Sequence, residues 1–180
     1  LLKGQVEFLM DILVEHPETG ELVTAPSNSP ENFPAFPGNG RFFDEVSGLY
    51  LKARTIAVAP TMDMQIIREV FTEFLEAAQT LGRDGDLAAD VAEAKDRLVL
   101  NRIGKHGQIQ EWIEDFDEIE VEHRHLSHLW GLYPGSEITP ERDPRMAAAA
   151  AVSIERRGTG GCGWSYGWKM GLWARLYNAD

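Results

Sequence analysis

The sequence is poor in three features, and each shortage excludes a class of protein. Its single cysteine, Cys162, excludes an intramolecular disulfide and a zinc site built from several cysteines. Basic residues are scarce: 17 Lys and Arg face 29 Asp and Glu, and a formal net charge of −12 argues against binding nucleic acid or an anionic membrane. No apolar run approaches the roughly 20 residues of a membrane-spanning helix. The composition favours a soluble protein with a neutral substrate.

Apolar residues are plentiful, at 43%, which is enough to bury a core as one domain, and they recur with helical spacing. The clearest helix is expected to have Thr61 as its N-cap and to end at Gly82. Other helices are predicted over 1–15, about 86–101, 146–155 and 164–176. Residues 20–60, rich in Pro, Gly, Ser and Asn, predict a packed loop with short strands. The predicted fold is therefore mostly α, as part of a helical barrel with long site-bearing loops.

Two segments concentrate side chains that suit a ligand. The first, His123–Gly135, holds three imidazoles, the Arg124 guanidinium and two aromatic rings, more polar groups than a core helix would bury. The second, 161–173, places aromatic rings beside Gly, Ser and Lys. In it, Trp164 is expected at the mouth of a site, and Trp168 and Trp173 in the core. Rings that stack on sugar faces beside groups that bind hydroxyls are typical of carbohydrate sites.

The three histidines of the first segment, His123, His125 and His128, also have a spacing that resembles metal ligands. On a strand His123 and His125 would share a face, but leucines at every third position favour helical turns, which would make His125 and His128 neighbours. No carboxylate stands at a familiar spacing such as His-Glu-x-x-His. Three interpretations stay open: metal ligands, structural histidines bonded to the backbone, or groups that bind sugar hydroxyls or orient a carboxylate.

Acidic side chains are similarly ambiguous. Asp63 lies in the first turn of the clearest helix, where an acid compensates the helix dipole by about 0.3–1 kcal/mol. That position favours the ionised carboxylate, so a proton donor there needs desolvation by neighbouring side chains. Glu31 and Asn32 fit either a pocket wall or a turn. Arg124 could bind hydroxyls or hold a catalytic carboxylate.

Several short motifs follow one another along the chain. They are LLKG at 1–4, LVTAPS at 22–27, SPEN at 29–32, PTMD at 60–63, HRHLSHL at 123–129, LYPG at 132–135, and GWS at 163–165 through LWAR at 172–175. Together they resemble glycoside hydrolase family 95, the inverting α-L-fucosidases that include 1,2-α-L-fucosidases. The resemblance covers nearly the whole chain, and the block 123–135 is its most specific part.

The resemblance implies an (α/α)6 barrel catalytic domain without a metal or organic cofactor, of which residues 1–180 would be roughly the C-terminal half. It implies an exo-acting enzyme that releases terminal fucose with inversion, in which a carboxylic acid protonates the glycosidic oxygen while water attacks from the opposite face. By position, Asp63 corresponds to that acid. The expected sugar ligands are Arg124, His125, His123, Trp164, Glu31 and Asn32.

In this family a pair of asparagines, supported by an aspartate, activates the water. The resemblance places the pair upstream of Leu1 and makes Asp180 the candidate aspartate, with Asn178 competing for the same alignment. We therefore expect a fragment of a longer polypeptide, inactive by itself, whose parent acts on a fucosylated oligosaccharide or polysaccharide. Because polymer-degrading relatives are often exported, the parent is expected to be extracellular or periplasmic.

Two alternatives come from other classes of protein. The first is a noncatalytic helical module that binds sugar, and the second is a metal-dependent hydrolase that uses His123, His125 and His128. Within the same family, α-L-galactosidase activity also stays open, because L-galactose differs from L-fucose only by a hydroxyl at C6.

Overall fold

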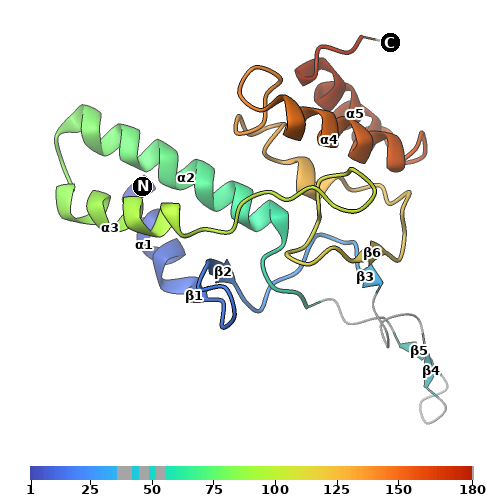
Figure 1. The fold of residues 1–180 in the computed structure, drawn as a ribbon, viewed down its shortest axis with the longest axis horizontal. Coiled ribbons are helices and arrows are strands. Elements are labelled where there is room, and N and C mark those ends of the chain that lie inside the picture. Colours follow the sequence, from blue (N-terminus) through green and yellow to red (C-terminus); the bar gives the residue numbers. More distant parts are fainter. Residues whose placement is uncertain (36–41, 45–48, 52–55, 180) are drawn as a thin grey trace.

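The structure is a computed structural model that describes residues 1–35, 42–44, 49–51 and 56–179 (Figure 1). Its α-helices are α1 (Leu2–Ile12), α2 (Thr61–Leu81), α3 (Gly85–Asp96), α4 (Pro144–Arg156) and α5 (Gly163–Arg175). Short strands and one 3-10 turn complete it: β1 (Leu13–Glu15), β2 (Leu22–Thr24), β3 (Pro34–Ala35), β4 (Phe42–Asp44), β5 (Leu49–Leu51), β6 (Asp117–Glu118) and η1 (Ser127–Leu129). The strands pair antiparallel as β1–β2, β3–β6 and β4–β5. The described chain is mostly helical, as predicted.

Helix α2 organises the first half of the molecule. Its apolar stripe is buried, with Phe71 at 0% exposure, and α1 and α3 pack against it through Val6 and Val91 (Figure 1). The helix ends at Gly82, whose φ of 61° is the left-handed conformation that glycine adopts without strain, as the sequence predicted. The short connection to α3 then forms a helical hairpin. This arrangement agrees with part of an α/α barrel.

A second core lies beneath α4 and α5 (Figure 1). Its centre is the leucine series predicted from the sequence, and these side chains meet α4 through small alanines: Leu126, Leu129, Leu132, Ala149 and Ala150. The Asp143 carboxylate accepts the Met146 N–H at 3.0 Å and caps α4. Trp168 and Trp173 pack against this core and are partly buried.

Two predicted helices end earlier than expected. The predicted helix 1–15 stops at Ile12, because Leu13–Glu15 pairs with Leu22–Thr24 as the β1–β2 hairpin. The predicted helix 86–101 stops at Asp96, because the chain beyond it runs alongside β2, where the Leu22 N–H donates to the Arg97 carbonyl at 2.8 Å. Pairing with β2 therefore overrides helical periodicity at both ends, through a hairpin at Leu13–Glu15 and through a parallel bridge between Leu22 and Leu98.

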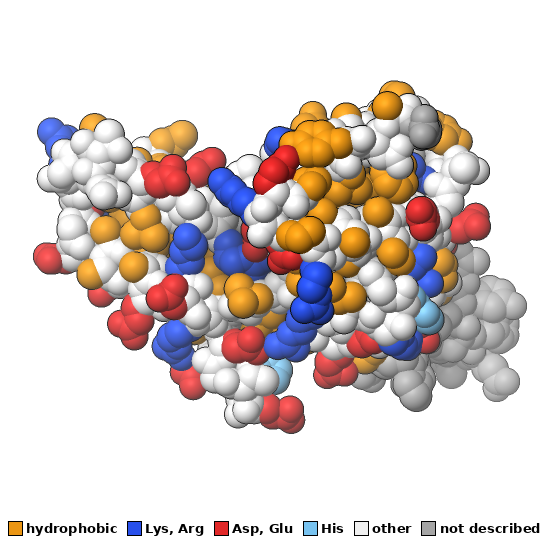
Figure 2. All heavy atoms as spheres, turned by 45° about the horizontal axis from the view of Figure 1, so that its top comes forward, with side chains coloured by type: hydrophobic (Ala, Val, Ile, Leu, Met, Phe, Trp, Pro, Cys, Tyr) orange, Lys and Arg blue, Asp and Glu red, His pale blue; other side chains and the backbone are white. Residues whose placement is uncertain are grey.

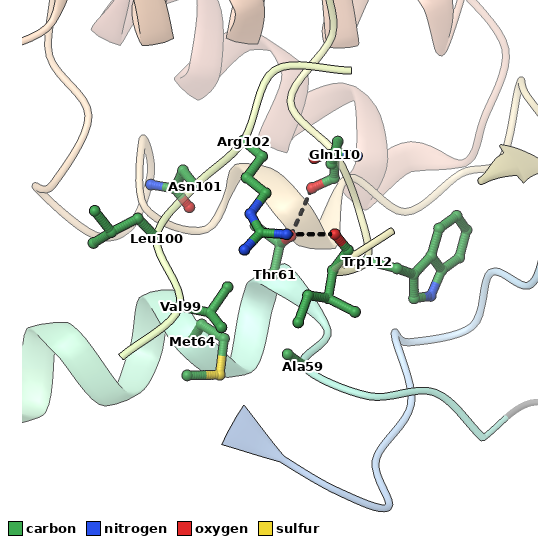
Figure 3. Close-up of a pocket in the computed structure, with 10 residues that line it drawn as sticks. Ala59, Thr61, Met64, Val99, Leu100, Asn101, Arg102, Gln110 and Trp112 are labelled. Carbon is green, nitrogen blue, oxygen red and sulfur yellow. Dashed lines mark hydrogen bonds between the residues drawn. The ribbon is translucent and has the colours of Figure 1, made fainter. Parts of the chain in front are cut away.

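The expected N-cap at Thr61 is also wrong. Thr61 is the first residue of α2, after Pro60, and its hydroxyl donates to the Gln110 carbonyl at 2.6 Å instead of accepting a helix N–H (Figure 3). Figure 3 shows this contact in a small pocket beside the start of α2, which is lined mainly by apolar side chains and Trp112. The start of α2 is thus tied to the segment 110–112.

The surface over α4 and α5 is unusually apolar (Figure 2). On α5 the exposed side chains include Trp164, Tyr166 and Met170, at 49%, 46% and 68% exposure, and Tyr177 follows the helix at 73%. Within the described residues, no helix has both the length and the apolar character needed to cross a membrane.

Candidate active site

The carboxylate of Asp63 is held by the loop that follows β2. In the first turn of α2, its Oδ2 accepts hydrogen bonds from the Thr24 hydroxyl at 2.9 Å and the Ser27 hydroxyl at 2.6 Å. The side chain is half-buried, and the described residues give the other oxygen, Oδ1, no hydrogen-bond partner. Asp63 is therefore fixed by one oxygen and can offer the other to a ligand.

The same loop continues to Glu31, which meets the histidine-rich segment. Its Oε2 accepts a hydrogen bond from Arg124 Nη2 and lies 3.5 Å from His125 Nε2. The side chains of Glu31 and Arg124 are 57% and 46% exposed, and that of His125 is 21% exposed. This cluster is an ion pair open to solvent, with an imidazole at its edge.

Aromatic rings continue the surface beyond His125. The rings of His123 and His125 lie 5.1 Å apart, and the Trp164 ring meets His125 edge-on at 4.9 Å. The His123 Nδ1 atom accepts the His125 N–H at 3.0 Å, so its proton is on Nε2 when the ring is neutral. Burial lowers the pKa of both imidazoles, which favours neutral rings at neutral pH. Neutral imidazoles beside an indole suit sugar hydroxyls and C–H faces.

The position of Trp164 depends on the loop before α5. Lys169, which is buried, donates through Nζ to the carbonyls of Gly158 and Gly160, each at 2.8 Å, and to that of Arg157 at 3.3 Å. One ammonium thus fixes the turn between α4 and α5. Trp164 is 49% exposed, and its position at the mouth of a site stays a prediction.

The histidines do not pair as the sequence suggested. His123 and His125 are the ring neighbours, because helical turns begin only at Ser127. His128 lies apart, fully buried, with Nδ1 3.8 Å from Glu111 Oε2. Burial holds the pKa of His128 well below 6.5. The described residues contain no group of three or more His, Cys, Asp or Glu placed to hold a metal ion.

The sequence reasoning missed Glu111, a buried carboxylate that adjoins the site. Its Oε1 accepts the Ser29 hydroxyl at 2.6 Å, and its Oε2 accepts Asn32 Nδ2 at 3.1 Å and Arg157 Nη2 at 2.7 Å. Burial raises the pKa of Glu111, and Arg157 and the two hydrogen bonds oppose that shift. A lone acid between the apolar Ile109 and Trp112 was the signal that could have found it.

The predicted site residues are therefore distributed over two connected groups. Asp63 is bound at Ser27, and the cluster around Glu31 lies four residues further along, so the Cα atoms of Ser27 and Glu31 are at most about 14 Å apart. Asn32 is buried, and its amide binds Glu111 while its Oδ1 accepts the Phe33 N–H at 3.0 Å. Asp180 lies outside the described residues.

Comparison with known proteins identifies the class: the glycosyl hydrolase family 95 catalytic domain matches residues 1–180. The chain belongs to this family. It is 42% identical over 181 residues to alpha-L-fucosidase 2 of Arabidopsis thaliana, covering 100% of the chain and 20% of that protein. It is 32% identical over 190 residues to probable alpha-fucosidase A of Aspergillus niger, covering 100% of the chain and 22% of that protein. The chain spans about a fifth of these relatives.

Proposed function

We propose that these residues form part of the catalytic domain of an exo-acting α-L-fucosidase, which releases terminal, 1,2-linked fucose from glycans with inversion. The observation that carries the proposal is the arrangement of one short segment, 24–32. It holds the Asp63 carboxylate by two hydroxyls at one end and brings Glu31 to Arg124 and His125 at the other. An acid and a polar sugar-binding cluster are thus joined by a single loop.

In the proposed reaction, Asp63 donates a proton to the glycosidic oxygen through Oδ1, which no described residue binds, while water attacks the anomeric carbon from the opposite face. Arg124, His125 and Glu31 bind fucose hydroxyls, and Trp164 presents its ring to an apolar face of the sugar. His123 completes the proposed set of sugar ligands, whereas Asn32, predicted as a further ligand, is buried with both ends of its amide bonded within the protein and is left out of the set. Asp180 stays the proposed support of the water-activating group.

The length comparison supports a second part of the proposal, that residues 1–180 are one portion of a larger barrel. The matched relatives are about five times longer, since the chain covers 20% of the Arabidopsis protein. The portion without the rest of the barrel is expected to be inactive. A glycan substrate also agrees with the net charge of −12, which disfavours polyanionic partners.

The deciding experiment follows 2′-fucosyllactose by proton NMR with the longer polypeptide that carries this segment. Inversion predicts that β-L-fucose is the first product and that it then mutarotates. Sugar binding without turnover would favour a noncatalytic module, and α-L-fucose as the first product would exclude inversion. The 180-residue chain alone, assayed in parallel, is expected to release no fucose.

Linkage and sugar preference need their own comparison. The proposal predicts a higher kcat/KM for the 1,2-linked fucoside than for 1,3- and 1,4-linked isomers, and for fucosides than for the matching α-L-galactosides. Equal kcat/KM values for fucosides and for the matching α-L-galactosides would contradict a preference for fucose and indicate an enzyme that accepts both sugars.

A further inference from the structure

Glu111 takes no part in the proposed reaction, yet it lies between the groups that do. Its side chain is 2% exposed, and three donors from distant parts of the chain occupy its two oxygens. A carboxylate so enclosed does not reach a substrate, so any effect on the reaction passes through its partners. Those partners connect to three parts of the candidate site.

The first connection is to the loop that carries Glu31. Ser29 and Asn32, on either side of Glu31, both donate to the Glu111 carboxylate. Two anchors that bracket a residue fix the path of the backbone between them. Glu31 itself points outward, with 57% of its side chain exposed, toward Arg124. Glu111 thus sets where Glu31 meets the sugar-binding cluster.

The second connection is to the segment that carries Arg124 and His125, and it is made through Arg157. Arg157 donates to Glu111 through Nη2 at 2.7 Å and, through Nε, to the His125 carbonyl at 3.0 Å. The guanidinium is 1% exposed, so water does not compete for these bonds. The Ser127 hydroxyl joins the two segments directly by donating to the Pro30 carbonyl at 2.6 Å. The backbones on both sides of the Glu31–Arg124 pair therefore meet at one carboxylate.

The third connection is made by the main chain. The Glu111 carbonyl accepts the Thr61 N–H at 3.0 Å, and the neighbouring Gln110 carbonyl accepts the Thr61 hydroxyl at 2.6 Å. Thr61 is two residues before Asp63, in the same turn of α2. The segment that carries Glu111 thus also sets the start of the helix that presents the acid.

We propose that Glu111 is a positioning residue of this site: its carboxylate sets the Glu31 loop against the Arg124–His125 segment, and its carbonyl sets the first turn of α2. The inference rests on the proposed function only for what these groups do to substrate; the positioning itself is testable without activity. Groups that orient ligand-binding residues commonly change activity by about 10–100-fold when removed, as around metal sites.

The first test measures hydrogen exchange in the longer polypeptide with Glu111→Gln. The new amide presents N–H groups to Arg157 and Asn32, which are themselves donors, so peptides covering 27–35 and 123–128 should exchange faster. The matched control is Glu137→Gln, which removes another ion pair, to the buried Arg68 at 2.7 Å, outside this network. Unchanged exchange in both peptides, or equal changes in the two variants, would overturn the proposal.

The second test measures kcat and KM in the longer polypeptide, per folded molecule. Glu111→Gln is expected to lower kcat/KM by about 10–100-fold, whereas Glu137→Gln stays near wild type. A Glu31→Gln and Glu111→Gln double variant should lose little more than the worse single variant, because both act through one loop. Losses that multiply would contradict the proposal.

Ser29→Ala keeps the test decisive if Glu111→Gln does not fold, because it removes one anchor without disturbing the buried charge. It should increase exchange at 27–35 and lower kcat/KM by a smaller factor; wild-type values in both measurements would refute the positioning role. A wild-type polypeptide that releases no fucose refutes the proposed function alone, since exchange still decides the role of Glu111.

Discussion

The regions around Asp63 and Glu111 show two ways in which this chain holds a carboxylate. Asp63 is half-buried and receives two neutral hydroxyls on one oxygen. Glu111 is buried and receives a hydroxyl, an amide and a guanidinium on both oxygens. Among the described residues, the first arrangement leaves one carboxylate oxygen without a hydrogen-bond partner, and the second leaves none. The number of bonded oxygens is therefore what distinguishes the proposed acid, Asp63, from the proposed positioning residue, Glu111.

The largest expected difference is in catalysis. Asp63→Asn in the longer polypeptide should lower kcat by about 10²–10⁴-fold, the range for loss of a general acid, because an amide does not donate the required proton. Asp86→Asn is a matched control, since Asp86 occupies the first turn of α3 but is exposed. Steady-state kinetics with 2′-fucosyllactose measures both; equal activity of the two variants would remove Asp63 from the reaction.

For stability we expect the opposite order, with a larger loss for Glu111→Gln than for Asp63→Asn. Glu111→Gln removes one of the two carboxylates that the buried Arg157 binds, leaving Glu118 at 2.6 Å, and should lower the free energy of unfolding by about 1.5–3 kcal/mol, as for the loss of a hydrogen bond to a charged group. Asp63→Asn keeps an acceptor for Thr24 and Ser27 and should cost about 1 kcal/mol or less. Urea denaturation of the longer polypeptide tests this order, and a larger loss for Asp63→Asn would contradict it.

The region around Glu111 should also respond to pH through His128. Burial holds the pKa of His128 well below 6.5, so the unfolded chain takes up a proton near pH 6.5 while the folded chain does not. The stability that neutral His128 contributes is complete above pH 6.5 and is lost as the pH falls below it, by at most about 1.4 kcal/mol per pH unit. The raised pKa of Glu111 acts in the opposite sense.

His128→Gln isolates the histidine contribution, because the variant keeps Glu111. Its unfolding free energy should decline less than that of the wild type between pH 7 and 5.5. Imidazole nitrogen shifts should show His128 neutral throughout this range. A His128 signal that titrates at its ordinary value would contradict the prediction.

The smallest expected effect concerns Trp164. Trp164→Ala should raise KM by several-fold, because an aromatic contact contributes about 0.5–1.5 kcal/mol, with little change in stability for a side chain 49% exposed. Tyr166→Ala, also exposed on α5, is the control and should leave KM unchanged. Equal KM values in both variants would remove Trp164 from the sugar site.

Local patterns predicted the helices well because their causes are local. The stripe of α2, the glycine that ends it and the leucine series at 126–132 all lie where periodicity put them. Contacts between distant residues were not predictable in this way. The ends of α1 and α3 depend on β2, and the Thr61 hydroxyl is bound by a carbonyl 49 residues away.

In the candidate site, too, features that depend on local composition were predicted, and a feature that depends on contacts between distant residues was missed. The segment 123–135 could be singled out by its composition, and it does bring Arg124 and His125 to Glu31. Glu111 was not singled out, because it is one acid among 29 Asp and Glu, and its apolar neighbours Ile109 and Trp112 are the one local sign of its burial. The importance of Glu111 arises from its hydrogen bonds to Ser29 and Asn32, which precede it by about 80 residues in the sequence, and to Arg157, which follows it by 46 residues.

The segment 24–32 also limits how this site can change in evolution. Thr24 and Ser27 hold the acid, while Ser29 and Asn32 hold the neighbourhood of Glu31. A residue inserted or deleted between Ser27 and Ser29 would shift the contacts of Asp63 relative to those of Glu31, and thus the proposed acid relative to the proposed sugar ligands. Side chains on the segment 123–128 or on the loop before α5 can vary without changing the length of the segment 24–32. Substitutions there are therefore the easier route to a new specificity.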